Sequence, residues 1–164
     1  GVIRTPEVRY VFDQWVFIND ASCMSLDSLK FLDSMLKEYP NITIDLFSHT
    51  DARGGDVRNQ VLSENRAKAV YKHLVETCGI DPRRIRPIGR GEAEPATWVD
   101  ENGQTVVLTE DYINQFKTSD KAKYEMLHTI NRRTTAKITS TTFDPATAPA
   151  PNPEYQKFKP LPRL

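Results

Sequence analysis

The chain lacks most of the features that assign a function directly. Its 164 residues carry 22 Lys plus Arg against 22 Asp plus Glu, so no net charge recruits nucleic acid or an anionic membrane. No apolar run approaches the roughly 18 residues that cross a bilayer, so we expect no transmembrane segment. The first residues, GVIRTPEVRY, do not have the pattern of a signal peptide. The length nevertheless suffices for one domain with a real core.

Cysteine and histidine are also scarce. Cys23 and Cys78 can form a disulfide or remain free thiols, because the sequence does not give the Cα separation that a disulfide requires. The three histidines have no H-E-x-x-H spacing. The chain contains neither a G-x-S-x-G elbow nor a P-loop ending in Gly-Lys-Ser/Thr. We therefore expect no metal, no cofactor and no enzymatic activity.

Hydrophobic periodicity predicts a strand–helix–strand–helix–strand order followed by one more strand. Strands are expected at 8–18, 42–47, 84–89 and 132–140, and helices at 25–38 and 57–78. This order favours an α/β (α+β) two-layer sandwich with the helices on one face of a mixed sheet. For the first helix we expect Ser25 as the cap and an apolar face of Leu26, Leu29, Leu32, Met35 and Leu36. The basic run from Arg83 to Arg86 is interpreted as a solvated strand edge.

Two segments lie outside this simple pattern. Residues 96–130 are expected to form an insertion, with a hairpin turning at Asn102-Gly103, a helix capped by Thr109 and another helix beginning at Ser119. The domain would then span residues 1–140. Residues 141–164 hold six of the eleven prolines and cannot build a packed core. This segment can be a linker, an arm laid across the domain or a partner-binding tail, and a linker is the default expectation.

The most informative stretch is SHTDARGGDVRNQVLSENR, residues 48–66. Asp51 lies in a glycine-rich loop after a strand, whereas Arg66 lies on the inward stripe of the following helix. Asn59 precedes Arg66 by two helical turns and points the same way. An inward arginine cannot lose its charge and needs an anion. That anion is either a structural partner such as Asp51 or a bound ligand, and the loop position favours the ligand.

Five blocks of sequence occur in an order that resembles the OmpA-like peptidoglycan-binding domain family. They are His49-Thr50-Asp51 with Gly54, residues 59–67, residues 79–85, residues 89–95, and Asn131-Arg132-Arg133. The resemblance covers roughly residues 10–140. It implies an OmpA-like βαβαβ-β sheet, with the insertion before the last strand. Where the family's pocket-bordering segment falls within residues 17–22, and whether Asn19, Asp20 or Ala21 contributes, stays open.

The resemblance implies non-covalent binding to the diaminopimelate of the peptidoglycan stem peptide. Asp51 would accept hydrogen bonds from the ligand ammonium, and Arg66 would donate to its carboxylate. Asn59, Leu62 and Arg132 match positions that line the same pocket, and backbone N–H groups around Ala52 would add donors. The implied location is the periplasm, associated with the outer membrane, so the natural protein must be exported and this chain is expected to be a mature fragment. A domain of the same fold that serves only assembly with envelope proteins is the alternative.

The pattern LTEDYIN followed by LHTINRRT is similar to OmpA-like proteins of the Bacteroidetes type. Some members of that group tether large envelope machines, including the type IX secretion system, to the cell wall. The resemblance therefore implies outer-membrane or secretion-machinery proteins as further partners.

Overall fold

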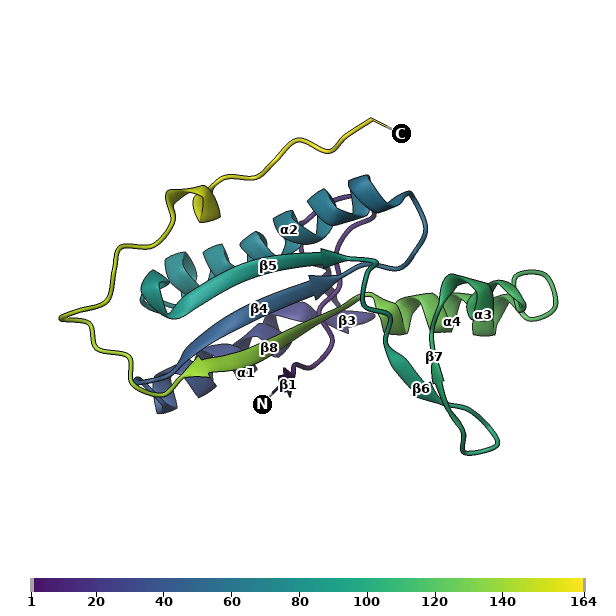
Figure 1. Cartoon of the computed structure of the whole chain (residues 1–164), viewed down its shortest axis with the longest axis horizontal. Coiled ribbons are helices and arrows are strands. Elements are labelled where there is room, and N and C mark those ends of the chain that lie inside the picture. Colours follow the sequence, from purple (N-terminus) through teal and green to yellow (C-terminus); the bar gives the residue numbers. More distant parts are fainter. Residues whose placement is uncertain (1, 164) are drawn as a thin grey trace.

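The computed structural model describes residues 2–163 and is built on a four-stranded sheet in the order β1–β8–β4–β5 (Figure 1). The strands are Val2–Arg4 (β1), Arg133–Ser140 (β8), Thr43–His49 (β4) and Ile85–Gly91 (β5). β4 and β5 run parallel, whereas β8 is antiparallel to both of its neighbours. Parallel neighbours need a crossover connection, which helix α2 (Asp56–Lys72) supplies. Gly1 and Leu164, the outer limits of the expected ranges, lie outside the described residues.

Helices α1 (Ser25–Glu38) and α2 cover one face of this sheet, so the predicted two-layer sandwich with a mixed sheet is confirmed (Figure 1). Apolar side chains of both layers meet between them. The fully buried members include Leu29, Leu32, Leu36, Ile44, Leu46, Val70 and Leu74. Gly89 of β5 permits the closest approach, because a Cβ there would lie 2.3 Å from the backbone nitrogen of Glu64 in α2.

The predicted second helix, 57–78, is confirmed with one refinement. Its last turn, His73–Thr77 (η1), widens to a π-helix, and Gly79 follows with a φ of +77°. This left-handed conformation ends the helix as expected of a glycine at that position.

The predicted first strand, 8–18, is wrong. Within that range the structure has one isolated bridge, Tyr10 to Phe17, and Asp13 has a φ of +55°. The strand that joins the sheet is β1, and residues beyond it are held by side chains at the start of α1. Ser25 Oγ accepts from the backbone N–H of Arg9 at 3.0 Å, so this N–H does not bond to a neighbouring strand. A short hairpin, β2 (Asn19–Asp20) with β3 (Cys23–Met24), then leads into α1.

Three further local predictions need correction. Ser25 does not cap α1, because its hydroxyl bonds Arg9, and Leu26 is exposed instead of joining the buried face. Arg84 is not part of a solvated strand edge. It belongs to the 3₁₀ turn η2 (Pro82–Arg84), is buried, and donates to the carbonyls of Ile42, Leu36 and Tyr39. A buried guanidinium is tolerated there because carbonyl acceptors surround it.

The inserted segment forms a small unit that projects from one end of the sheet (Figure 1). It contains the hairpin β6 (Thr97–Val99) and β7 (Thr105–Val107), and helices α3 (Glu110–Asn114) and α4 (Lys121–Asn131). Thr109 caps α3 as predicted, but Asp120, not Ser119, caps α4. The unit has its own apolar core, formed by Ala96, Leu108, Ile113, Tyr124 and Leu127.

The proline-rich segment runs along α2 as an arm (Figure 1). Asn65 and Lys159 exchange two hydrogen bonds, at 2.7 and 2.9 Å, and Tyr155, in the 3₁₀ turn η3 (Pro153–Gln156), packs edge-on against Tyr71. Of the three alternatives, the structure therefore favours the arm laid across the domain. Cys23 and Cys78 are free thiols. None of the helices within residues 2–163 has the length and apolar character needed to span a bilayer.

Candidate functional site

A cavity of about 690 Å³ lies at the end of the sheet, between the loop that follows β4, the start of α2 and helix α4. We call this loop, residues 49–55, the HTD loop after His49-Thr50-Asp51. β4 delivers the loop to this edge, while the segment before α1 closes the opposite side with Tyr10, Asp13 and Ile18. The lining carries six arginines and three carboxylates: Arg9, Arg53, Arg58, Arg66, Arg132 and Arg133 against Asp13, Asp51 and Glu125. This excess of positive charge favours a ligand with carboxylate groups.

The Asp51 end of the cavity is an ion-pair network. The carboxylate accepts from Arg53 Nε at 3.2 Å and Arg53 Nη2 at 3.0 Å, and also from Arg132 Nη1. The backbone N–H of Arg53 adds a bond at 2.9 Å. Burial alone would raise the pKa of Asp51, but these hydrogen bonds outweigh it and hold the pKa below its usual value. Asp51 is therefore a carboxylate at neutral pH.

The Arg66 end is different. The residue Arg66 is 7% exposed. Its side chain donates from Nε to the carbonyl of Gln14 at 2.9 Å and lies over the Tyr10 ring with 4.8 Å to the centroid. Burial lowers the pKa of Arg66, although a guanidinium stays charged in proteins. In the part of the chain that the structure describes, Arg66 forms no ion pair with any carboxylate. The expected alternative of a structural Asp51–Arg66 pair is therefore wrong.

Other predicted site residues occupy different positions. Asn59 and Leu62 line the cavity, and Asn59 Nδ2 donates to the carbonyls of Asp51 and Arg53 at 3.1 and 2.8 Å, which fixes the loop. Arg132 also lines it, whereas Ala52 does not. Within residues 17–22, Ile18 is the residue that contributes to the lining.

Helix α4 of the insertion supplies part of the wall, which the sequence did not predict. Glu125 accepts from Arg53 Nη1 at 3.2 Å through each of its two oxygens. Thr129 accepts from Arg132 Nη2 at 2.9 Å. Both α4 residues are four apart and therefore share one helix face, but no local pattern indicates that this face meets the HTD loop.

His49 does not add charge to the cavity. Burial, followed by the nearby Arg133 and Arg90, lowers its pKa to about 4, so the imidazole is neutral at pH 7. Within residues 2–163 no group of three or more His, Cys, Asp and Glu side chains is arranged to hold a metal ion. The site is thus an array of arginines and carboxylates suited to binding a charged ligand.

Comparison with known proteins identifies the family of the chain. The model of the OmpA family matches residues 25–106, which is half of the chain. The chain belongs to the OmpA family. The matched range contains β4, the HTD loop, α2 and β5, and therefore both Asp51 and Arg66.

Relatives of this OmpA-family chain include bacterial envelope proteins. Outer membrane porin F of Pseudomonas aeruginosa is 39% identical over 95 residues, which are 57% of this chain and 26% of the porin. The peptidoglycan-associated lipoprotein of Rhizobium meliloti is 32% identical over 94 residues, 56% of this chain and 53% of the lipoprotein. The chain thus spans only part of these relatives.

The crystal structure of the peptidoglycan-associated lipoprotein from Burkholderia pseudomallei has the same fold. It superposes with a TM-score of 0.51 at 19% identity, over 82% of this chain and 87% of the lipoprotein.

Proposed function

We propose that this domain binds peptidoglycan without covalent attachment, through the free end of diaminopimelate in the stem peptide. That end carries an ammonium and a carboxylate on one carbon. The carboxylate would accept a forked pair of hydrogen bonds from Arg66, and the ammonium would donate to Asp51. Asn59, Leu62 and Arg132 would complete the pocket, with backbone donors near Ala52.

The buried Arg66 is the observation that carries this proposal. A buried guanidinium that forms no ion pair with a carboxylate is costly. Arg66 and Asp51 line one cavity of about 690 Å³, and both lie inside the range that matches the OmpA family. A ligand carboxylate would supply the missing anion.

A titration with paired ligands tests the proposal. A muropeptide with diaminopimelate should bind the wild type and lose affinity for Arg66→Ala and Asp51→Ala. The same muropeptide with lysine lacks the terminal carboxylate and should bind the wild type as weakly as the diaminopimelate ligand binds Arg66→Ala. Equal affinity for both ligands would contradict a role for Arg66 in carboxylate recognition.

We further propose that the domain acts in the periplasm and anchors an outer-membrane protein or envelope complex to the wall. Two of the relatives carry outer-membrane or peptidoglycan association in their names. The Bacteroidetes-like LTEDYIN pattern makes a type IX secretion complex one candidate cargo. The alternative, an assembly domain without peptidoglycan binding, is favoured if the folded wild type binds neither muropeptide.

A further inference from the structure

The Asp51 carboxylate is paired with side chains of the protein itself. Its side chain is 9% exposed, and both oxygens accept from arginines: Oδ1 from Arg53 Nε, and Oδ2 from Arg53 Nη2 and Arg132 Nη1. A ligand ammonium cannot reach this carboxylate at hydrogen-bond distance unless one of the two guanidinium groups moves away.

Arg53 is the guanidinium that can move. Its side chain is 39% exposed. It precedes Gly54 and Gly55, whose φ values of +94° and +84° place this part of the loop outside helical geometry. Arg132, by comparison, sits at the junction of α4 and β8 and is also held by Thr129. Arg132 is nearly as exposed, at 34%, but its second partner is a neutral hydroxyl, so Arg53 is the guanidinium that keeps a charged partner on leaving Asp51.

Glu125 of α4 provides a second anchor for Arg53. Its two oxygens both lie 3.2 Å from Arg53 Nη1, so Arg53 bridges Asp51 and Glu125. If Arg53 leaves Asp51, it keeps this contact and can turn its guanidinium fully onto Glu125. The moving charge is thus never left without a carboxylate partner, which lowers the cost of the movement.

We propose that Arg53 is an internal competitor for Asp51, and that ligand binding exchanges it for the ligand ammonium while Glu125 receives it. This inference rests on the proposed function, because it assumes that Asp51 binds an ammonium. In this arrangement Arg53 sets the affinity and Glu125, supplied by the insertion, favours the ligand-bound arrangement. Arg53 and Glu125 act on the site by positioning and competition.

The competition predicts an increase in affinity when Arg53 is removed. Arg53→Ala should bind the diaminopimelate muropeptide about fivefold more tightly than the wild type, the ratio that corresponds to one partly exposed ion pair. Arg53→Gln, which keeps a polar side chain without the charge, should behave in the same way. Tighter binding is not expected if Arg53 contacts the ligand directly; binding would then weaken.

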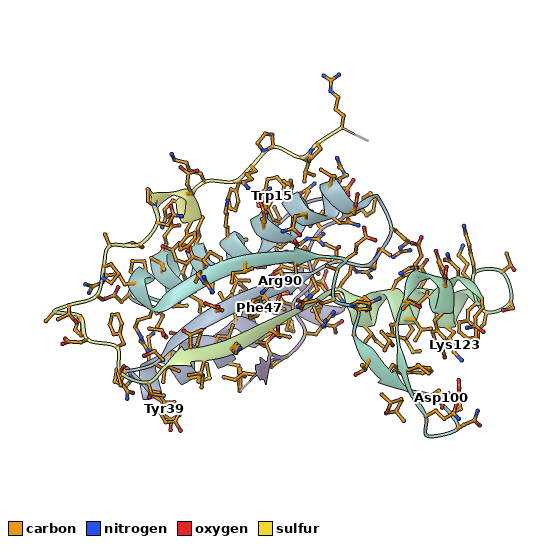
Figure 2. The ribbon with its side chains drawn as sticks, viewed as in Figure 1. Trp15, Tyr39, Phe47, Arg90, Asp100 and Lys123 are labelled. Atoms are coloured by element: carbon orange, nitrogen blue, oxygen red, sulfur yellow. The ribbon has the colours of Figure 1, made fainter. Side chains whose placement is uncertain are left out.

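Arg90 offers a matched control. Its side chain is 42% exposed, pairs with Glu94, and lies over the Phe47 ring at 4.8 Å on the sheet, where Figure 2 labels both residues. Arg90 does not line the Asp51 cavity. Arg90→Ala removes the same charge and should leave the affinity within about twofold, whereas a gain equal to that of Arg53→Ala would show a general effect of charge and overturn the exchange.

A double-mutant cycle tests whether Glu125 receives Arg53 or binds the ligand itself. Glu125→Gln alone should weaken binding about threefold, because Arg53 loses its receiving carboxylate. In the Arg53→Ala background, Glu125→Gln should leave the affinity unchanged, since the Arg53 guanidinium is no longer present. Equal weakening in both backgrounds would show that Glu125 binds the ligand itself and would overturn the exchange.

The outcomes also separate this inference from the proposed function. Binding by the wild type that Asp51→Ala removes, together with weaker or unchanged binding by both Arg53 variants, would overturn only the exchange. Absence of binding by the folded wild type and by Arg53→Ala would overturn both. Circular dichroism and the melting temperature of each variant establish that the comparisons are made between folded proteins.

Discussion

The two ends of the cavity carry opposite charges and are prepared to different degrees. Asp51 is paired with Arg53 and Arg132, so the protein itself satisfies this carboxylate. Arg66 is buried with one carbonyl and one aromatic ring as direct partners, and it forms no ion pair with a carboxylate among the described residues. Under the proposed function the arginine end would be a preformed anion site, whereas the aspartate end would have to exchange partners.

This difference predicts which end of the cavity contributes more to the free energy of binding. At Arg66 the proposed ligand carboxylate would gain a buried, charge-assisted interaction without displacing another one. At Asp51 the proposed ligand ammonium would replace an existing arginine, so part of the gain would be offset. We therefore expect substitutions at Arg66 to affect binding more strongly than substitutions at Asp51.

The largest effect is expected for Arg66→Ala. Loss of a buried, forked hydrogen-bond pair to a carboxylate should weaken muropeptide binding by about 100-fold. Arg66→Lys should recover little of this affinity, because an ammonium cannot make the planar fork. Calorimetric titration measures both variants, and full affinity of Arg66→Lys would rule out the forked geometry.

The free energy of unfolding should not fall when Arg66 is replaced by an apolar residue of similar length, although affinity is lost. Arg66→Met removes an unpaired buried charge, so the free energy of unfolding should stay equal or rise by about 1 kcal/mol while binding is lost. Urea denaturation measures this change. A loss of several kcal/mol would indicate that Arg66 has a structural role, and Arg66→Ala would then lose affinity for that reason.

A smaller effect on binding is expected for Asp51→Asn. The amide retains hydrogen-bonding capacity but no charge, and the wild-type gain at this position is already reduced by competition with Arg53. We expect affinity to fall by about tenfold. Because Arg53 and Arg132 lose their shared carboxylate, unfolding free energy should also fall by about 1 kcal/mol. A loss of affinity larger than that of Arg66→Ala would reverse the proposed order of the two ends.

The sequence predicted this pocket unevenly, for physical reasons. Helical periodicity placed Arg66 on the inward stripe of α2, and the strand pattern placed Asp51 beyond β4; both follow from local geometry. The pairing of Asp51 with Arg53 depends on the loop conformation, which two glycines leave undetermined by pattern alone. Glu125 reaches Arg53 across 72 positions of sequence, and no periodicity encodes such a contact.

The fold shows the same division. The helices and central strands were predicted because each buries one periodic face. Residues 8–18 were predicted as a strand, but the structure uses the Ser25 hydroxyl to hold Arg9 and leaves that segment out of the sheet. Arg84 was placed at the surface because of its charge, whereas three backbone carbonyls make its burial possible.

A small effect should reach the Arg66 end from the C-terminal arm. Phe158 contacts Trp15 with 5.4 Å between ring centroids, and Figure 2 shows Trp15 next to α2, one residue after the Gln14 carbonyl that accepts from Arg66. Phe158→Ala should weaken binding about twofold, because the segment around Gln14 becomes less ordered, at a stability cost of about 1 kcal/mol. Phe143→Ala, in the same proline-rich segment but away from Trp15, is the control and should leave affinity unchanged.

The smallest change in affinity is expected for a change of pH, which tests whether the ligand ammonium binds Asp51 or a second carboxylate. Because the pKa of Asp51 is held below 3.8, its contribution is complete above that pH and is lost only as the pH falls through the lowered value. Affinity should therefore stay constant between pH 7 and about pH 5. Glu92 accepts from Asn59 Nδ2 at 3.3 Å, and burial raises its pKa, so an ammonium bound by Glu92 would lose affinity as the pH is lowered toward that raised pKa. Calorimetry as a function of pH, repeated on Asp51→Asn and Glu92→Gln, would show which carboxylate the ligand uses; a decline with falling pH that Glu92→Gln removes would transfer the ammonium site to Glu92.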